Sequence, residues 1–272
     1  ARVPIVHLCG GETTQGAVDE CYRHAITKMA QIHCVSNEQY RKRVIQLGEA
    51  PERVFNTGET GIENILQLTP LPLQQLEVAV GMTLEGSFAV VTFHPVTLEE
   101  DTAAAQCTQL FAALDHFPDF KFVITKANAD AGGRTINHLV DGYAQQRSNV
   151  SAVTSLGMVR YLSLLHYATL AIGNSSSGII EVPSFHIPTV NIGDRQKGRM
   201  QAESILNVSP TTEDIVKGIQ KALTKEFQAV CQTAKNPYGD GKSSDRILTI
   251  IKEYLAQGPS VCKSFYDLDF NL

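Results

Sequence analysis

The sequence predicts an α/β fold with parallel sheets, and three observations lead to this prediction. Short apolar runs, the length of buried strands, occur throughout the chain. Between them lie longer stretches whose apolar residues recur every three or four positions, as on one face of a helix. The two kinds of segment alternate, which is typical of the strand–helix–strand units that build parallel sheets. At 272 residues and 43% hydrophobic residues, the chain can bury one large core or two smaller ones.

The expected elements follow one another in nearly strict order. The apolar runs predict strands at residues 3–8, 32–35, 54–56, 88–92, 120–125, 150–153, 170–172 and 189–192. The helical periodicity predicts helices at residues 19–29, 37–47, 102–116, 133–145, 158–166, 213–223 and 245–255. The last of these helices has one apolar face, which we expect to pack against the first domain and away from the second.

A change of composition predicts the boundary between two domains. Residues 68–86 carry two prolines and no clear strand pattern, and a strand follows directly after them. We therefore assign residues 1–75 to a first domain and residues 76–235 to a second. Residues 236–272 are interpreted as a linker and a helix that returns to the first domain.

Composition and charge exclude several classes of function. The net charge is −5 and the pI is near 5.9, so the chain has no overall attraction for nucleic acid. No apolar run is long enough to span a bilayer, and we expect no membrane role. The six cysteines show no C-x-x-C spacing and sit mostly among apolar residues. They suit core positions in a reducing, cytoplasmic protein better than a disulfide framework or a zinc site.

A phosphate-binding loop is predicted at residues 173–178, directly after the expected strand at 170–172. Small residues allow backbone N–H groups to turn toward an anion, and Ser175, Ser176 and Ser177 add hydroxyl donors. We expect a helix behind the loop, opened by Ile179 and the apolar residues after it, to point its positive dipole end at the anion. The alternative is a strand-to-helix turn whose serines only cap the helix.

An acidic residue and two arginines extend this loop to a nucleotide site. Glu181 is expected in the first turn of the helix, where its carboxylate can accept hydrogen bonds from sugar hydroxyls. Arg195 and Arg199 follow the expected strand at 189–192. Their planar guanidinium groups suit a pyrophosphate, so we favour the nucleotide interpretation over simple capping.

Polar side chains also gather after the first strand. Asp19 and Glu20 stand four residues before Arg23 and His24, which places two acid–base pairs on adjacent faces of a helix. Open α/β folds place ligands at the carboxyl ends of their strands, so this cluster is a candidate site. A solvated helix start with acids at its positive end explains the pattern equally well.

Two more strand ends carry polar residues. His94 follows the strand at 88–92 and precedes a proline, which suits a cleft better than a core, although a turn histidine that bonds its neighbours remains an alternative. Asn128 and Asp130 follow the next strand and either approach a ligand or cap a helix. Four other histidines have no partners at metal-ligand spacing: His33, His116, His138 and His166. We interpret them as structural and predict no metal site.

Taken in order, these segments resemble the UDP-N-acetylglucosamine 2-epimerase family, and in particular its hydrolysing branch, which makes N-acetylmannosamine for sialic acid synthesis. The resemblance covers almost the whole chain and rests on HLCGGE, AVDECYRHAITKMA, TFHPVT, NADAGG, GNSSSGIIEV, NIGDRQKGR and NPYGDG. It implies two Rossmann-like domains in a glycosyltransferase-B-like fold, with the substrate between them. It also implies that relatives have an upstream part of the first domain, which we expect to be missing from this sequence.

The resemblance assigns roles to the candidate residues. In the second domain, Ser175, Ser176 and Gly178 would hold the diphosphate, Glu181 the ribose hydroxyls and Arg195 the phosphate region. The predicted UDP site is completed by Asn128, Asp130 and Arg199.

The catalytic roles fall on four residues. Asp19 or Glu20 is implied for proton transfer at the sugar, and His94 would act near the diphosphate as donor or general acid. Many relatives carry a carboxylate where this chain has Cys9. Either Glu12 replaces that carboxylate or the substrate of this chain differs.

The implied reaction eliminates UDP across C1 and C2 of the sugar and then adds water with inversion at C2, without a metal or another cofactor. A non-hydrolysing epimerase is one alternative, disfavoured because its members carry Glu-Glu before Asn-Arg where this chain has DECYRH. A UDP-sugar binding module without catalysis is another, and a generic glycosyltransferase is disfavoured because it needs no proton-transfer cluster. The expected assembly is a homo-oligomer, dimer or tetramer.

Overall fold

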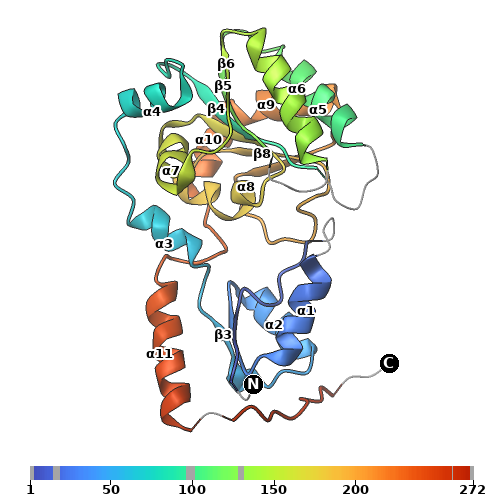
Figure 1. Ribbon diagram of the computed structural model, residues 1–272, viewed down its shortest axis with the longest axis vertical. Coiled ribbons are helices and arrows are strands. Elements are labelled where there is room, and N and C mark those ends of the chain that lie inside the picture. The colour runs from blue at the N-terminus through green and yellow to red at the C-terminus, as the bar shows by residue number, and fades with distance from the viewer. Residues whose placement is uncertain (1–2, 15–18, 96–101, 128–131, 259, 270–272) are drawn as a thin grey trace. The chain divides into compact units, whose positions relative to one another are not determined.

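The computed structural model describes residues 3–14, 19–95, 102–127, 132–258 and 260–269. The chain forms two parallel sheets and divides into two compact units (Figure 1). Among the described residues, unit 1 comprises 3–14, 19–67 and 237–269, and unit 2 comprises 68–236. The predicted α/β class and two-part organisation are confirmed, whereas the domain limits at residues 75 and 235 stay a prediction. No helix in the described ranges is both long and apolar enough to cross a bilayer.

Unit 1 is a three-stranded parallel sheet with helices on both faces (Figure 1). Ile32 and Cys34 of the central strand point to one face, where Ile247 of the last helix packs on them. The last helix thus packs on the sheet of unit 1, while the assignment of residues 236–272 to a linker and a returning helix stays a prediction. The elements are β1 (Val6–Leu8), α1 (Asp19–Met29), β2 (Ile32–Val35), α2 (Glu38–Gln46), a 3-10 turn (Pro51–Arg53), β3 (Val54–Asn56), α3 (Gly61–Leu66) and α11 (Ser243–Ala256).

Unit 2 is a six-stranded parallel sheet in the order β6-β5-β4-β7-β8-β9. Its first half is α4 (Leu73–Val80), β4 (Phe88–Thr92), α5 (Ala103–Leu114), β5 (Lys121–Thr125), α6 (Gly133–Gln145), β6 (Val150–Val153) and α7 (Gly157–Tyr167). Its second half is β7 (Leu170–Gly173), α8 (Ser176–Ile180), a 3-10 turn (Val182–Phe185), β8 (Thr189–Ile192), β9 (Ile205–Val208), α9 (Thr212–Ala222) and α10 (Lys225–Thr233).

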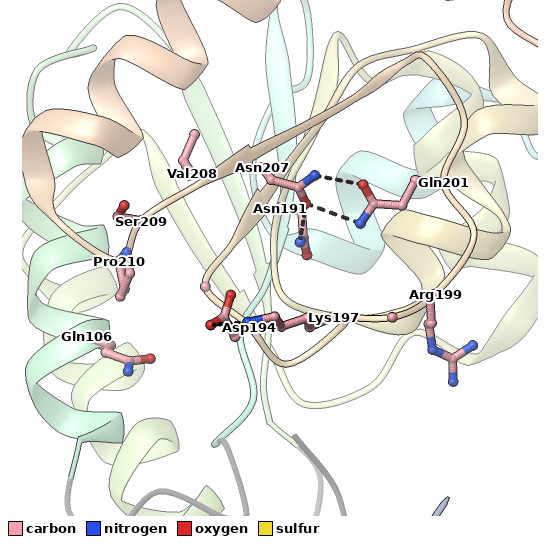
Figure 2. A pocket seen from close by; sticks show the side chains of 12 residues that line it. Gln106, Asn191, Asp194, Lys197, Arg199, Gln201, Asn207, Val208, Ser209 and Pro210 are labelled. Carbon is pink, nitrogen blue, oxygen red and sulfur yellow. Dashed lines mark hydrogen bonds and ion pairs between the residues drawn. The ribbon is translucent and has the colours of Figure 1, made fainter. Parts of the chain in front are cut away.

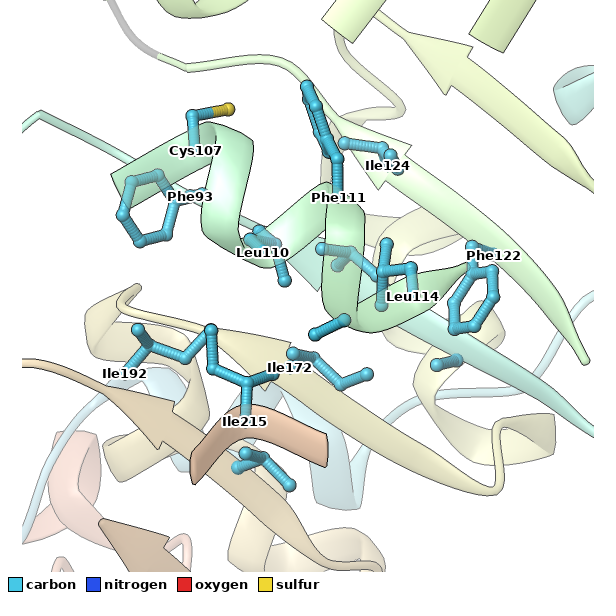
Figure 3. Close-up of a cluster of buried hydrophobic side chains, with 14 of the residues drawn as sticks. Phe93, Cys107, Leu110, Phe111, Leu114, Phe122, Ile124, Ile172, Ile192 and Ile215 are labelled. Carbon is cyan, nitrogen blue, oxygen red and sulfur yellow. The ribbon is translucent and has the colours of Figure 1, made fainter. Parts of the chain in front are cut away.

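The main core of unit 2 lies between the sheet and α5, α6 and α9 (Figure 3). Leu110 and Leu114 of α5 are each 1% exposed and pack with Phe122, Ile172 and Ile215. Burial of each such side chain stabilises the fold by roughly 1.5–3 kcal/mol. This packing holds β4 and β7 as a rigid pair, and the loops that leave their carboxyl ends carry several of the candidate residues.

Residues 68–86, where the sequence analysis places the boundary between domains, contain the helix α4. Both prolines precede α4, and Pro72 is its N-cap, a position from which a helix can start without the backbone N–H that proline lacks. Leu76 and Val80 on this helix are buried. The sequence analysis expected no helix here, because it did not recognise that the prolines start this helix and do not interrupt it.

The cysteines are less buried than expected. All six are free thiols, and Cys34, Cys107 and Cys231 are buried as small core residues. Cys21 and Cys262 are exposed, and Cys9 is half-buried.

A buried ion cluster in unit 1 joins α1 and the C-terminal segment to β2. The Glu49 carboxylate lies 2.6 Å from Lys28 Nζ and 2.7 Å from Lys263 Nζ. The third neighbour of this carboxylate is the His33 ring, whose Nε2 lies 3.0 Å from Glu49 Oε2. The sequence analysis interpreted His33 as structural and without a partner. Its partner is Glu49, which follows α2 and lies beside β2 in the fold.

The charges in this cluster shift two pKa values. Burial lowers the pKa of His33 to about 4, with Lys263 acting in the same direction and Glu49 opposing it. Burial alone would raise the pKa of Glu49, but the ammonium groups of Lys263 and Lys28 hold it below its ordinary value. Near neutral pH the cluster therefore holds a carboxylate, two ammonium groups and a neutral imidazole.

We expect the free energy of unfolding to decrease as the pH falls from 6.5 to about 4. In this window the unfolded state binds a proton at His33 and the folded state does not, so lower pH favours unfolding by up to about 1.4 kcal/mol per pH unit. Urea unfolding at pH 7, 6 and 5 measures this slope. His33→Gln should show a smaller slope than the parent protein, and equal slopes would contradict the assignment.

Candidate functional site

The carboxyl ends of β4 and β7 lie side by side in the middle of the six-stranded sheet. Thr92, the last residue of β4, is paired with Gly173, the last residue of β7. The order of strands reverses at this point, because the chain continues from β4 to β5 on one side and from β7 to β8 on the other. Open α/β sheets bind ligands at such a reversal, so these two strand ends are the candidate site.

Asn174 connects the two strand ends, and it was not among the residues chosen from the sequence. Its backbone N–H donates to Thr92 O at 3.1 Å. Its side-chain oxygen accepts from the His94 N–H at 2.7 Å, and its side-chain nitrogen donates to His94 O at 2.8 Å. Asn174 is 1% exposed, and it holds the main chain at His94 from both sides.

The carbonyl of Asn174 also gathers the loop after β8. Arg195 Nη1 donates to this oxygen at 3.1 Å, and Gln196 Nε2 donates to it at 2.8 Å. The structure therefore brings together His94 and Arg195, which the sequence analysis had assigned to the same site from separate motifs. The available signal in the sequence was an asparagine directly after an apolar strand, where a polar side chain that becomes buried needs hydrogen-bond partners.

The serine loop caps a short helix. Ser175 is the N-cap of α8, and its hydroxyl accepts from the Ser177 N–H at 3.3 Å. The Ser177 hydroxyl accepts from Tyr161 at 2.8 Å. Capping, the alternative left open by the sequence, is therefore present, and α8 begins at Ser176 and not at Ile179. Glu181 is the C-cap of α8, so its expected place in the first turn was wrong.

Gly178 has a packing role that the sequence did not reveal. A Cβ added at Gly178 would lie 3.0 Å from Thr189 Cγ2, and Thr189 Oγ1 donates to Gly178 O at 2.8 Å. The glycine therefore lets α8 approach β8 closely.

Arg199 lines a hollow of unit 2 to which Arg195 does not contribute. Figure 2 shows this hollow, which has a volume of about 610 Å³. It is lined mainly by the loop between β8 and β9, together with residues of both strands, of α5 and of the turn after β9. Asn207 lies at its centre, where it accepts from Asn191 at 2.8 Å and donates to Gln201 at 2.7 Å. Arg195, Ser175 and Ser176 are not among the lining residues. Two further predicted UDP ligands, Asn128 and Asp130, lie outside the described residues.

In unit 1, the acidic residue predicted to replace the missing carboxylate is buried. Glu12 is 4% exposed, and its Oε1 accepts from the Ser36 hydroxyl at 3.3 Å. The Cys9 thiol donates to Glu59 Oε2 at 3.2 Å. Burial first, and then the Glu59 carboxylate, raise the pKa of Cys9 well above its ordinary value, so the thiol is protonated at neutral pH. Glu59 was missed because its position, 50 residues after Cys9, matches no local motif.

The helix-start cluster is partly confirmed. His24 Nε2 lies 3.6 Å from Glu20 Oε1, as the four-residue spacing predicted. Glu20 Oε2 also accepts from the Thr14 N–H at 3.3 Å. Arg23, which was expected beside Asp19, donates to the main-chain oxygen of Glu12 at 3.1 Å. Asp19 is the first residue of α1 and is exposed.

Comparisons with known proteins identify a family for the chain. A family described as UDP-N-acetylglucosamine 2-epimerase matches residues 1–252. The chain is 39% identical to the polysialic acid biosynthesis protein P7 of Escherichia coli over 98% of its own length and 68% of that protein. It is 41% identical to the hydrolysing GDP/UDP-N,N′-diacetylbacillosamine 2-epimerase of Campylobacter jejuni, over 84% of the chain and 59% of that protein. The chain thus spans between about three fifths and two thirds of these relatives.

Solved structures share the fold at lower sequence identity. The UDP-GlcNAc 2-epimerase of Neisseria meningitidis bound to UDP-GlcNAc matches with a TM-score of 0.77 and 17% identity, over 92% of this chain and 70% of that one. The co-structure of S. aureus MnaA with UDP matches with a TM-score of 0.75 and 17% identity, over 99% of this chain and 71% of that one.

Proposed function

Because the chain belongs to the UDP-N-acetylglucosamine 2-epimerase family, we propose that it acts in the hydrolysing branch, on a UDP-linked acetamido sugar. The products would be UDP and the free sugar inverted at C2, N-acetylmannosamine when the substrate is UDP-N-acetylglucosamine. One observation carries the choice of branch: relatives at 41% and 32% identity are named as hydrolysing 2-epimerases. The expected dimer or tetramer and the cytoplasmic location stay predictions.

The proposed reaction has two steps. A base removes the C2 proton while the C1–O bond breaks, and its electron pair leaves with UDP, so that an unsaturated sugar remains. Water then adds its hydroxyl at C1, and a proton returns to C2 on the opposite face. In this proposal Asp19, Glu20 or Glu12 exchanges the C2 proton, and His94 donates a hydrogen bond or a proton to the departing diphosphate.

Arg195 is proposed to stabilise the departing UDP. Its guanidinium group donates to the Asn174 carbonyl, which holds it at the end of β7 beside the serine loop. A positive charge held in place before the reaction stabilises the charge that develops on the leaving diphosphate. Ser175, Ser176, Gly178 and Glu181 belong to the same proposed UDP site. Arg199, Asn128 and Asp130 are its remaining proposed members.

Nuclear magnetic resonance in deuterated water tests the reaction. The chain is incubated separately with UDP-N-acetylglucosamine and with UDP-N,N′-diacetylbacillosamine, and the sugar signals are followed. We expect UDP and a free C2-inverted sugar that carries deuterium at C2. UDP-N-acetylmannosamine as the product would instead support the non-hydrolysing alternative, for which a 30% identical relative from Neisseria meningitidis, named simply UDP-N-acetylglucosamine 2-epimerase, is the supporting observation. UDP binding without turnover would support the binding module.

Arg195→Ala should weaken UDP binding by roughly ten- to a hundredfold, the loss of about 1.5–3 kcal/mol expected for a hydrogen bond to a charged group. Isothermal titration calorimetry with UDP measures the change. Lys197→Ala is the matched control, because Lys197 belongs to the same loop, is 61% exposed and lies 3.6 Å from Asp194. An unchanged UDP affinity in Arg195→Ala would remove this arginine from the site.

A further inference from the structure

Three side chains that commonly ligate metals converge in unit 1. Cys9 follows β1, Glu12 lies three residues later, and Glu59 lies between β3 and α3. Each residue offers one ligand atom, which is the sulfur of Cys9 or a carboxylate oxygen of Glu12 or Glu59. These three atoms lie within 4.8 Å of one another. The sequence analysis predicted no metal site, because the histidines have no partners at ligand spacing and the cysteines show no C-x-x-C spacing.

The backbone holds this convergence in place. The Cys9 N–H donates to Cys34 O at 2.9 Å, and the Thr57 N–H donates to Val35 O at 2.9 Å. Both loops are therefore tied to the end of the central strand, β2. The Glu59 N–H donates to Tyr238 O at 2.7 Å, which fixes the position of the second loop further.

Two carboxylates lie in the cluster, and the Arg23 guanidinium, which donates to the main-chain oxygen of Glu12 at 3.1 Å, also acts on the Cys9 thiol. Glu12 is 4% exposed, so water provides little solvation for its carboxylate. In the described part of the chain, the Glu59 carboxylate accepts from the Cys9 thiol and from the Thr60 hydroxyl at 3.4 Å, and no ion pair to it is present. Cys9 and Glu59 are half-buried, which leaves a path from solvent to the three ligand atoms.

The ligand types select among metals. Zinc is bound at about 2.3 Å by sulfur and about 2.0–2.2 Å by carboxylate oxygen, so its ligands in a tetrahedral site stand roughly 3.3–3.8 Å apart. The 3.2 Å between Cys9 Sγ and Glu59 Oε2 is close to this spacing. A thiolate favours Zn²⁺ and Co²⁺ over Mg²⁺, which prefers oxygen ligands alone.

We propose that Cys9, Glu12 and Glu59 form a binding site for Zn²⁺ or a similar transition-metal dication. On binding, the Cys9 thiol gives its proton to solvent, and the sulfur turns from Glu59 to the metal. The three side chains supply three ligands, and water takes the fourth position. Glu12 is shared with the proposed epimerase site, so in the metal-bound chain proton exchange would fall to Asp19 or Glu20. Metal binding itself is measured without the sugar substrate.

Cobalt provides a direct test, because a thiolate bound to Co²⁺ has a charge-transfer absorption band in the near ultraviolet. The metal-free chain is titrated with Co²⁺ and then with Zn²⁺, and Mg²⁺ is titrated separately. We expect one equivalent of Co²⁺ to produce the band, Zn²⁺ to displace it, and Zn²⁺ but not Mg²⁺ to raise the melting temperature. Absence of the band, or an equal thermal shift with Mg²⁺, would overturn the proposal.

Variants locate the ligand. Cys9→Ser should abolish the band, and Glu59→Gln should weaken Zn²⁺ binding by roughly tenfold or more. The double variant Cys21→Ser with Cys262→Ser is the control, since both are exposed thiols that would bind metal adventitiously. It should keep the band. Circular dichroism checks that each variant is folded. If Cys9→Ser does not fold, a weakened cobalt band in Glu59→Gln tests the site in its place. A band that persists in Cys9→Ser or disappears in the control would refute the site.

Discussion

Gly173→Ala is expected to lower the free energy of unfolding of unit 2 by about 4 kcal/mol or more, which places it among the most damaging single substitutions. Gly173 has a φ of 134°, a conformation that residues with a side chain rarely adopt. A Cβ at this position would lie 1.9 Å from Thr92 O. Because β4 and β7 are paired there, the overlap can be relieved only by separating the two strands that carry the site.

Urea unfolding followed by circular dichroism measures this loss. Gly193→Ala is the matched control, since Gly193 follows β8 at the same edge of the sheet and has a φ of 70°. No atom lies within 4 Å of the Cβ that alanine would add there. The control should therefore show only the conformational cost, about 1–2 kcal/mol. Similar losses in the two variants would mean that the steric overlap at Thr92 does not determine stability.

Asn174→Ala is expected to have the second largest effect. The substitution removes the side-chain acceptor for His94 N and the donor to His94 O, and it leaves both His94 groups without this partner. Each such loss at a buried position costs about 1–3 kcal/mol, so the free energy of unfolding should fall by about 2–4 kcal/mol. We also expect weaker UDP binding, because the backbone at His94 is no longer held at the strand end.

Asn207→Ala is the control for this substitution. Asn207 is an asparagine at the same edge of the sheet with hydrogen bonds to Asn191 and Gln201, but it is exposed, so water can replace its partners. It should lose less than about 1 kcal/mol. Unfolding curves and UDP titrations of both variants are compared. If Asn174→Ala were no less stable than Asn207→Ala, the proposed role of Asn174 in joining β4 to β7 would be wrong.

Much of the fold was predictable because its strands are short apolar runs with sharp limits. β2, β3, β4, β6 and β8 have the predicted bounds, and so do α1 and α6. The elements that were missed have weaker patterns. β9 lies at the sheet edge with only part of its length buried, and α4 follows two prolines that resemble a linker in the sequence alone.

The candidate site was predicted less completely, for a physical reason. A motif shows which residues are near one another along the chain, whereas hydrogen bonds join residues that only the fold brings together. Asn174 was passed over because its partners, His94 directly after β4 and Arg195 in the loop after β8, lie far from it along the chain. Glu181 was misplaced because the Ser175 cap starts α8 earlier than the apolar pattern suggests.

By itself, the sequence determined the α/β class, the order of most elements and the resemblance to an epimerase family, since these depend on apolar periodicity and on residues that are local in the chain. Only the tertiary structure decided that Asn174 holds His94 and Arg195 together, and that Glu59 lies beside Cys9. Parallel pairing of strands brings the ends of distant segments to one edge of a sheet. Contacts at that edge depend on side-chain direction and loop closure, which periodicity does not encode.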